Sequence, residues 1–543
     1  MILWTPHQIL REEHNDTLSI GKAFSAPGIA RVSQNKIIIL TMILIKRQNW
    51  YGAGIPKEVK FVIDILKKKG FETYIVGGCV RDFLRNVEPL DWDVTTNAKP
   101  EKIQKIFKKS YLENRFGTVT VLTGSKYLTL KEIEITPFRI ESKYSDKRHP
   151  DKISWAKTIE EDLKRRDFTV NAMALGIEIK DKKQETRLID LFGGQKDLKN
   201  KIIKAVGDPK ERFSEDALRM MRAIRHVVTL GEGWKIEEKT AQAIKENFIW
   251  LAAISKERIR DELMKIIMSE RAAEGIEILR ESGLLKYIIP ELEEGYKVTQ
   301  NKHHIYECYD HYLKSLDYAA KQGFNKYVRL AALFHDIGKP RVKEGEGPDA
   351  TFYSHEIVGA KMTSQILNRL RFSKKDIEKI VKLVRYHLFY YTPEEVGESS
   401  VRRLLRKVGP ENMEELLQVR MADRIGSGVP KAEPYKLRHL KYVVEKVSQD
   451  PISVKMLKVN GNDVMKILNI QPGPKVGEIL DILLSYLLED PKKNEKEFLE
   501  REIKKIGELS EEKLKELTKK ARKEREKIEQ KRDEMTKRKY WVT

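Results

Sequence analysis

Residues 74–82 read YIVGGCVRD, and this stretch decides the fold of the front part of the chain. The apolar run Tyr74-Ile75-Val76 predicts a buried strand, the two glycines predict a sharp turn, and a helical pattern resumes at Val80. Glycines let a ligand approach the backbone N–H groups without interference from a Cβ atom. Because those N–H groups open a helix and Arg81 adds a guanidinium, the turn suits phosphate, although most glycine pairs are ordinary turns.

Two carboxylates follow the turn, at Asp91 and Asp93 on either side of Trp92. Side chains at positions i and i+2 of a strand share one face, so the pair is predicted to lie about 6 to 7 Å apart along the chain. Such a pair can share one or two Mg²⁺ ions for phosphoryl-group chemistry. A lone pair of this kind is more often a surface turn, but the glycine turn before it favours a metal site.

Hydrophobic periodicity divides the chain into two architectures. Residues 118–122 and 128–136 alternate as strands do, which predicts a mixed α and β domain from about residue 50 to 205. Glu132 and Glu134 share one face of the second predicted strand, and either could approach the metals, so both stay unassigned. From Pro209 to about residue 445 the pattern is almost wholly helical.

Composition limits the class of partner. With 543 residues, the chain is too long for one hydrophobic core, and its 104 basic against 82 acidic residues leave a net charge of +22. This charge favours nucleic acid as the partner, ahead of an anionic membrane surface. The two cysteines, Cys79 and Cys308, exclude a disulfide framework and predict an intracellular protein. The apolar run at residues 37–45 is too short to span a bilayer. It is interpreted either as a short buried strand or as part of an uncertain extension, residues 1–50, within which Met42 would be a sensible true start.

Five ordered motifs carry a family resemblance. They are GGCVRD with LDWDVTT (residues 77–96), RIESKYSDKRHP (139–150), EDLKRRDFTVNAMA (161–174), DLFGGQKD (190–197) and RFSEDALRMMRAIR (212–225). This series resembles the motifs of class II tRNA nucleotidyltransferases, the CCA-adding enzymes, and of bacterial poly(A) polymerases. In the family, the second motif is a flexible loop, the third is rich in arginine, the fourth is a hinge and the fifth is a base-reading helix. The resemblance covers residues 56–290.

The resemblance implies a site for nucleoside triphosphates. Asp91 and Asp93 would hold Mg²⁺ as the catalytic carboxylates, while Asp216 and Arg219 would read the Watson–Crick edge of cytosine or adenine. The implied nucleotide-binding residues are Gly77, Gly78, Arg81, Arg165, Arg166, Asn171, Asp216, Arg219, Arg222 and Arg225. The last four recur every three residues and would form a slowly drifting stripe along one helix, which in isolation is typical of an ion-paired surface helix.

A second constellation lies downstream, where six of the eleven histidines fall between residues 303 and 387. Imidazole and carboxylate ligands together suit Mn²⁺, Fe²⁺, Ni²⁺ or Zn²⁺. Residues 333–339, LFHDIGK, resemble the signature of HD-domain phosphohydrolases. The resemblance implies a first metal bound by His311, His335, Asp336 and Asp423, and a second metal or a phosphate bound by His355 and His387. Its candidate substrates are 2′,3′-cyclic phosphates and phosphate monoesters at RNA ends.

Together the resemblances imply an α+β, polymerase β-like head followed by all-α neck, body, HD and tail domains. The expected order is an uncertain extension (1–50), a nucleotidyltransferase head (51–205), a helical neck and body (206–300), an HD domain (301–430), a tRNA-binding tail (431–495) and a charged helix or disordered segment (496–543). The implied function is cytoplasmic addition of CCA, or part of it, to tRNA from CTP and ATP, without a membrane. A poly(A) polymerase, or an HD phosphohydrolase with an RNA-binding front half, is the alternative.

Overall fold

The computed structural model describes residues 54–113, 117–142, 152–180, 183–301, 305–448 and 453–542. The predicted extension at residues 1–50 and most of the predicted flexible loop at 139–150 lie outside these residues. Two compact units divide the chain, Met1–Ile140 with Ile153–Leu198, and Glu141–Lys152 with Lys199–Thr543. Among the described residues, no helix is long and apolar enough to cross a membrane.

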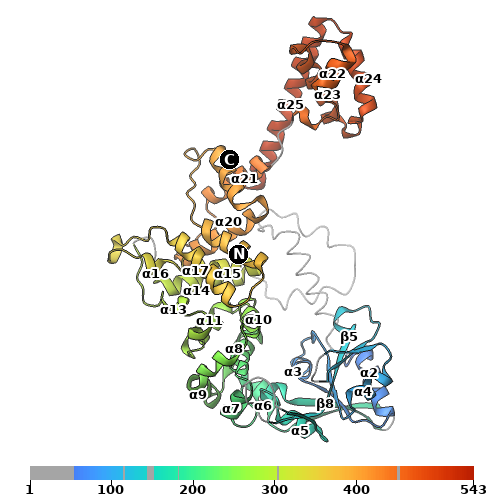
Figure 1. Cartoon of the computed structure of the whole chain (residues 1–543), viewed down its shortest axis with the longest axis vertical. Coiled ribbons are helices and arrows are strands. Elements are labelled where there is room, and N and C mark those ends of the chain that lie inside the picture. Colours follow the sequence, from blue (N-terminus) through green and yellow to red (C-terminus); the bar gives the residue numbers. More distant parts are fainter. Residues whose placement is uncertain are drawn as a thin grey trace, which may run out of the picture. The chain divides into compact units, whose positions relative to one another are not determined.

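Among its described residues, the first unit is built on a seven-stranded sheet in the order β3-β4-β5-β2-β1-β8-β9. Two of these strands, β5 and β8, are labelled in Figure 1. Neighbouring strands are antiparallel except β2 and β5, which run parallel. The strands are β1 (Thr73–Val76), β2 (Asp93–Thr96), β3 (Ser110–Leu112), β4 (Val119–Leu122), β5 (Glu132–Pro137), β8 (Met173–Lys180) and β9 (Lys183–Asp190), and the chain also forms β6 (Arg139–Ser142) and β7 (Lys152–Trp155). This mixed sheet confirms the predicted α+β head.

Short helices complete the first unit. Helix α2 (Lys57–Lys68) places its apolar residues at helical spacing, and Val59, Val62, Ile63 and Leu66 are all fully buried in the core of the sheet. The remaining helices are α3 (Gly78–Leu84), α4 (Pro100–Ile106), α5 (Ile159–Lys164) and α6 (Gly194–Asn200). The core therefore lies beneath β1 and β2, whose ends carry the glycine turn and the aspartates.

Two local predictions for the head were wrong. Residues 128–130 form a 3-10 turn, η2 (Leu128–Leu130), rather than the start of a strand. The reason is that pairing between β4 and β5 begins only at Leu122 opposite Glu132, which leaves the residues between them in the hairpin connection. Asp91 and Asp93 were predicted to lie on one strand, but Asp91 lies in a bend and strand β2 begins only at Asp93.

From Lys199 on, the described residues are mainly helical, in agreement with the all-α prediction, and their β structure consists of the short parallel pair β10 (Ile202–Ile203) and β11 (Lys235–Ile236) and an isolated bridge between Glu344 and Thr351. Its first helices are α7 (Pro209–Glu215), α8 (Leu218–Thr229), α9 (Glu238–Asn247), α10 (Lys256–Ile267), α11 (Ala272–Glu281), α12 (Leu285–Ile288) and α13 (Pro290–Glu293). There follow α14 (Cys308–Lys321), α15 (Lys326–Phe334), α16 (Lys339–Val342), α17 (His355–Arg369), α18 (Lys374–Tyr386), α19 (Glu398–Val408), α20 (Met413–Gly426) and α21 (Tyr435–Ser448).

The C-terminal bundle consists of α22 (Gly461–Leu468), α23 (Pro474–Glu489), α24 (Lys496–Gly507) and α25 (Glu511–Lys539). The bundle extends past the tail boundary predicted at residue 495, because Leu499, Ile503 and Leu514 are buried in its core. These aliphatic residues recur at helical spacing, and a core can form from them without aromatic residues. Residues 496–507 and 511–539 are thus helical, and buried residues of both helices belong to the core of the tail bundle.

Candidate active site and metal centre

The glycine turn lies directly against the predicted catalytic groups. Gly77 has φ 84° and ψ −142°, a conformation that only glycine adopts without strain. A Cβ atom on Gly77 would lie 3.2 Å from Asp93 Oδ2 and 3.3 Å from Arg166 Nη1. The absence of a side chain at Gly77 therefore lets the Asp93 carboxylate and the Arg166 guanidinium lie close to the backbone at the end of β1.

Asp91 and Asp93 flank Trp92, whose side chain is buried while Asp91 is exposed. Glu134 on β5 is paired with Asp93 on β2 in the parallel register. Burial, and then the negative charges of Asp91 and Glu134, raise the pKa of Asp93 to about 7, while Arg166 opposes this shift. Carboxylates that disfavour each other's ionisation form a site that a divalent cation stabilises, so this donor set of oxygens fits Mg²⁺.

The two glutamates left unassigned by the sequence are distinguished by the register of β5. Glu134 is opposite Asp93, whereas Glu132, the first residue of β5, is opposite Leu122 of β4. Glu134, but not Glu132, is among the charges that raise the pKa of Asp93. The strand pairing is a long-range property, which is why the alternation of residues 128–136 could not separate the two.

Arg81 is buried and bound by polar groups on two sides. Its Nη1 donates to Asn171 Oδ1 at 2.8 Å, and its Nε and Nη2 donate to the Asp82 carboxylate at 3.0 and 2.8 Å. Asn171 in turn donates to Asp167 Oδ1 at 3.3 Å. Arg81 and Asn171, predicted separately from two motifs, are therefore parts of one hydrogen-bonded group beside the glycine turn.

The arginine pair is organised by Asp162, which the sequence analysis did not single out. Asp162 is completely buried on α5, and its Oδ1 and Oδ2 accept from Arg165 Nη2 at 2.7 Å and Arg166 Nη2 at 3.1 Å. Burial acts to raise the pKa of Asp162, but the two guanidinium groups hold it below its usual range. The spacing of Asp162 to Arg165 and Arg166, three and four residues along a helix, is the signal that could have identified it.

The predicted base-reading helix is broken at Asp216. This residue is extended, with φ −144° and ψ 102°, and it separates α7 from α8. The break follows from its side chain, since Asp216 Oδ1 accepts from the Leu218 backbone N–H at 3.1 Å and so begins the second helix. Asp216 therefore does not continue the stripe of arginines along α8.

Most of the four residues predicted to form the stripe take part in ion pairs. Asp216 pairs with Arg258 of α10, and Arg219 Nη1 lies 2.5 Å from Glu215 Oε2. Arg225 Nη1 pairs with Glu262 Oε1 of α10 at 3.2 Å. Arg222 is half-buried on α8. These residues belong to the second unit, whereas Asp91, Asp93, Arg81, Arg165, Arg166 and Asn171 belong to the first.

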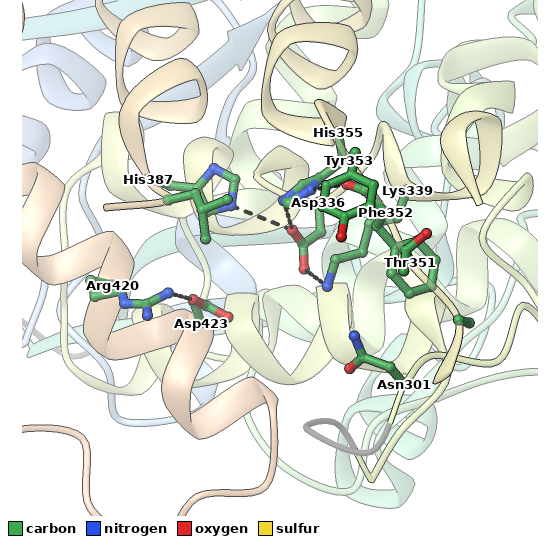
Figure 2. A pocket seen from close by; sticks show the side chains of 12 residues that line it. Asn301, Asp336, Lys339, Thr351, Phe352, Tyr353, His355, His387, Arg420 and Asp423 are labelled. Carbon is green, nitrogen blue, oxygen red and sulfur yellow. Dashed lines mark hydrogen bonds and ion pairs between the residues drawn. The ribbon is translucent and has the colours of Figure 1, made fainter. Parts of the chain in front are cut away.

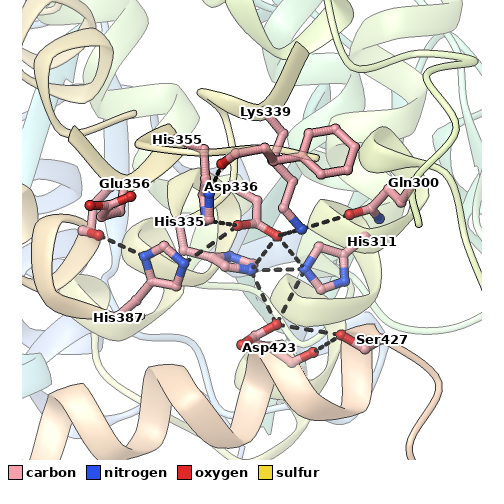
Figure 3. Close-up of polar contacts among 12 residues, drawn as sticks. Gln300, His311, His335, Asp336, Lys339, His355, Glu356, His387, Asp423 and Ser427 are labelled. Atoms are coloured by element: carbon pink, nitrogen blue, oxygen red, sulfur yellow. Dashed lines mark hydrogen bonds and ion pairs between the residues drawn. The ribbon is translucent and has the colours of Figure 1, made fainter. Parts of the chain in front are cut away.

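All six predicted ligands of the HD site come together in the second unit. His311, His335, Asp336 and Asp423 form one group, and Asp336, His355 and His387 form another, with the ligand atoms of each group within 4.8 Å of one another. Asp336 belongs to both groups. Its Oδ2 lies 3.0 Å from His311 Nε2, and its Oδ1 lies 3.2 Å from His355 Nε2 and 3.4 Å from His387 Nε2 (Figure 3).

The histidines are oriented by the backbone. The Nδ1 atoms of His335, His355 and His387 contact the carbonyl oxygens of residues 332, 352 and 384 at 2.7 to 2.8 Å. A carbonyl oxygen can only accept, so each Nδ1 carries the proton and each Nε2 is left as a ligand atom. Although burial lowers it, the pKa of His335 is raised to about 10 by Asp336 and Asp423. The imidazole and carboxylate donors of the two groups fit transition-metal ions, which these residues would hold with Asp336 common to both groups.

A pocket of about 320 Å³ opens beside the second group of ligands. Lys339, Arg420 and Asn301 contribute polar groups to its wall, and Tyr353 and Leu388 contribute apolar surface (Figure 2). Lys339 Nζ lies 2.6 Å from Asp336 Oδ2, and Arg420 Nη1 lies 2.6 Å from Asp423 Oδ2. Two cations next to a dinuclear ligand set can bind an anionic phosphate group.

Three family models match the chain in this order: "Poly A polymerase head domain" at residues 73–204, "Probable RNA and SrmB- binding site of polymerase A" at 233–295, and "HD domain" at 304–427. These ranges run close to the predicted head, neck and HD domains. The fold and these matches thus define the class of protein in which a polymerase A head domain precedes an HD domain in one chain.

Comparison with individual proteins is more specific. The chain is 32% identical to the CCA-adding enzyme of Enterococcus faecalis, over 82% of this chain and 95% of that protein. It is 46% identical to the CCA-adding enzyme of Lactobacillus helveticus, but there the match spans about half (53%) of that protein. The crystal structure of the Bacillus stearothermophilus CCA-adding enzyme in complex with CTP superposes with a TM-score of 0.52 at 27% identity, over 83% of this chain and 98% of that one. The chain belongs to the CCA-adding enzyme family.

Proposed function

We propose that the protein is a template-independent nucleotidyltransferase that adds CCA, or part of it, to the 3′ end of tRNA from CTP and ATP. The observation that carries the proposal is the close approach of both Asp93 and Arg166 to the position that a Cβ atom of Gly77 would occupy. A glycine turn, the carboxylate proposed to bind the metal and the arginine proposed to bind the triphosphate thus lie close together. With these substrates, the proposed place of action is the cytoplasm.

In the proposed mechanism the 3′-hydroxyl of tRNA attacks the α-phosphate in line and pyrophosphate leaves. Asp91 and Asp93 would hold Mg²⁺, which when bound would stabilise the charge on the attacking and leaving oxygens. Arg81, Arg165 and Arg166 bind the triphosphate near the Gly77-Gly78 turn, and Asn171 orients Arg81. These residues act by positioning and electrostatics, so no covalent intermediate with the protein is needed.

Base choice is assigned to the second unit. Asp216 and Arg219 read the incoming base, and Arg222 and Arg225 complete the nucleotide-binding helix. A buried acceptor or donor that finds no partner is costly, so a fixed carboxylate and guanidinium reject bases with the wrong Watson–Crick edge.

The test is incubation of the full chain with tRNA that ends before CCA, and with each nucleotide separately. Addition limited to C, C and A, and its loss in Asp91→Ala and Asp93→Ala variants, would support the proposal. Unlimited addition of A to unstructured RNA would instead identify a poly(A) polymerase. Nucleotide addition that persists in both aspartate variants would refute the assignment of the metal ligands.

A second activity, metal-dependent phosphoester hydrolysis, is proposed for the HD site. The Asp336 carboxylate that faces both histidine groups supports it, together with Lys339 and Arg420 in the adjoining pocket. We propose Mn²⁺, Ni²⁺, Fe²⁺ or Zn²⁺ as the metal and 2′,3′-cyclic phosphates or phosphate monoesters as substrates. Hydrolysis of such substrates that depends on added metal, and that is lost in His311→Ala and His335→Ala variants, would support it. Equal rates with and without a chelator would refute it.

A further inference from the structure

Asp216, the carboxylate proposed to read the base, accepts two hydrogen bonds from one arginine of another helix. Arg258 Nη1 donates to Asp216 Oδ1 at 3.2 Å, and Arg258 Nη2 donates to Asp216 Oδ2 at 2.6 Å. The two residues are far apart in the sequence, and Arg258 lies in the first turn of α10. Two parallel bonds from one guanidinium fix the plane of a carboxylate as well as its position.

The other hydrogen bonds of Asp216 show which acceptor sites of its carboxylate remain available. A carboxylate has about four lone-pair sites, two on each oxygen. Oδ1 accepts from Arg258 and from the Leu218 backbone N–H at 3.1 Å, whereas Oδ2 accepts only from Arg258 among the bonds described for it. Oδ2 therefore keeps one lone-pair site, and the two hydrogen bonds from Arg258 determine its direction.

We infer that Arg258 is a positioning residue for nucleotide selection: it holds Asp216 so that the remaining acceptor site of Oδ2 meets the amino group of the incoming base. This inference rests on the proposed function. Cytosine and adenine both carry an amino group at that Watson–Crick position, whereas uracil and guanine carry a carbonyl oxygen there. An acceptor fixed in direction attracts the first pair and repels the second, so its orientation decides the selection.

Packing between α8 and α10 does not depend on Arg258. Ile259, Leu263 and Ile266 of α10 are buried, and Glu262 of α10 forms a separate ion pair with Arg225 of α8. The Arg258 side chain retains 30% exposure, so its removal opens no buried cavity. Loss of the two hydrogen bonds from Arg258 is therefore expected to let the Asp216 carboxylate change its orientation, while helices α8 and α10 stay in place.

The test compares selectivity in three variants of the full chain. Arg258→Gln removes the charge, and Arg258→Lys keeps the charge but cannot form the two-pronged contact. Arg260→Gln is the matched control, because it removes the same charge two residues along the same helix, where the side chain pairs with Asp261. For each variant, kcat/KM is measured for CTP against UTP on tRNA without CCA, and for ATP against GTP on tRNA that ends in CC. Thermal unfolding is recorded in parallel.

Both Arg258 variants are expected to lose about tenfold or more in the ratio of correct to incorrect nucleotide, with unchanged unfolding temperatures, while Arg260→Gln stays within about twofold of the wild type. Retained selectivity in either Arg258 variant overturns the inference, and so does an equal loss in Arg260→Gln. If the glutamine variant does not fold, the lysine variant decides. A wild-type protein that adds no nucleotide overturns the proposed function itself, whereas selective addition by the wild type and by the Arg258 variants overturns only the role of Arg258.

Discussion

Gly77 and Asp93 approach each other so closely that a Cβ atom on the glycine would lie 3.2 Å from the carboxylate Oδ2. The glycine also has φ 84° and ψ −142°, which other residues adopt only with strain. Two separate physical costs, one of backbone conformation and one of space, therefore act on any substitution at this position.

The Gly77→Ala variant is expected to lose nucleotide addition by about a hundredfold, because the methyl group displaces Asp93 and Arg166 by tenths of an ångström. The backbone strain should lower the free energy of unfolding by about 1 to 3 kcal/mol. Gly124→Ala is the control, since Gly124 also has a positive φ, 75°, but nothing lies within 4 Å of its Cβ position. Steady-state kinetics and thermal unfolding of both variants measure these effects. Equal losses of activity in Gly77→Ala and Gly124→Ala would contradict the role of the Gly77 position.

Binding of Mg²⁺ is expected to depend on pH through Asp93. Its pKa is raised to about 7 by burial and by Asp91 and Glu134, so below pH 7 a proton competes with the metal for the carboxylate. Affinity for Mg²⁺ should therefore increase by roughly tenfold from pH 6 to pH 8 and level off above pH 7. Titration of the full chain with Mg²⁺ by calorimetry at several pH values measures this dependence.

Removal of one neighbouring charge tests the cause of that shift. Glu134→Gln should lower the pKa of Asp93 by about one unit, so that the midpoint of the Mg²⁺ titration moves to lower pH. Glu132→Gln is the matched control, because Glu132 lies on the same strand but is opposite Leu122. A midpoint that moves equally in both variants would contradict the assignment of Glu134 as the neighbour of Asp93.

Asp162 provides a prediction for stability. Its buried carboxylate binds Arg165 and Arg166, so Asp162→Asn would leave both guanidinium groups without their charged partner and lower the free energy of unfolding by roughly 3 kcal/mol. Because the folded pKa of Asp162 is lowered, its contribution is present above the pKa of the unfolded chain and is lost as the pH falls through the folded value. The exposed neighbour Glu160 serves as control. Urea unfolding should show a smaller difference between wild type and Asp162→Asn at pH 3 than at pH 7, because pH 3 lies below the pKa of the carboxyl in the unfolded chain.

Local patterns predicted the head fold and most of the candidate residues, because a strand, a glycine turn and spaced charges are encoded within short stretches. Properties that depend on distant partners were not predicted. Asp216 lies in an extended break because of its bond to the Leu218 backbone and its ion pair with Arg258, neither of which is visible as periodicity. Leu499 and Leu514 joined the tail core although charged residues surround them, because burial depends on the helices they meet.

The histidines of the HD site likewise show some properties that short sequence patterns predict and others that depend on distant partners. The sequence predicted all six residues, but that Asp336 is shared by the two groups follows only from the packing of α14, α15, α17, α18 and α20, which bring residues from five segments together. The orientation of His355 and His387 by backbone carbonyl groups is likewise a tertiary property, since it fixes Nε2 toward Asp336.

The shared position of Asp336 leads to a prediction of metal content. Wild-type protein reconstituted with Mn²⁺ should bind about two ions at the HD site, and Asp336→Ala should lose both, because its two oxygens face the two groups separately. His387→Ala should lose only the second ion, since His387 belongs to one group. Asp310→Asn, an exposed position one residue before His311, should keep both. Metal analysis after gel filtration, with the carboxylates of the first unit changed to alanine so that they do not contribute, gives the count. Retention of one ion by Asp336→Ala would show that this carboxylate serves a single metal rather than bridging two.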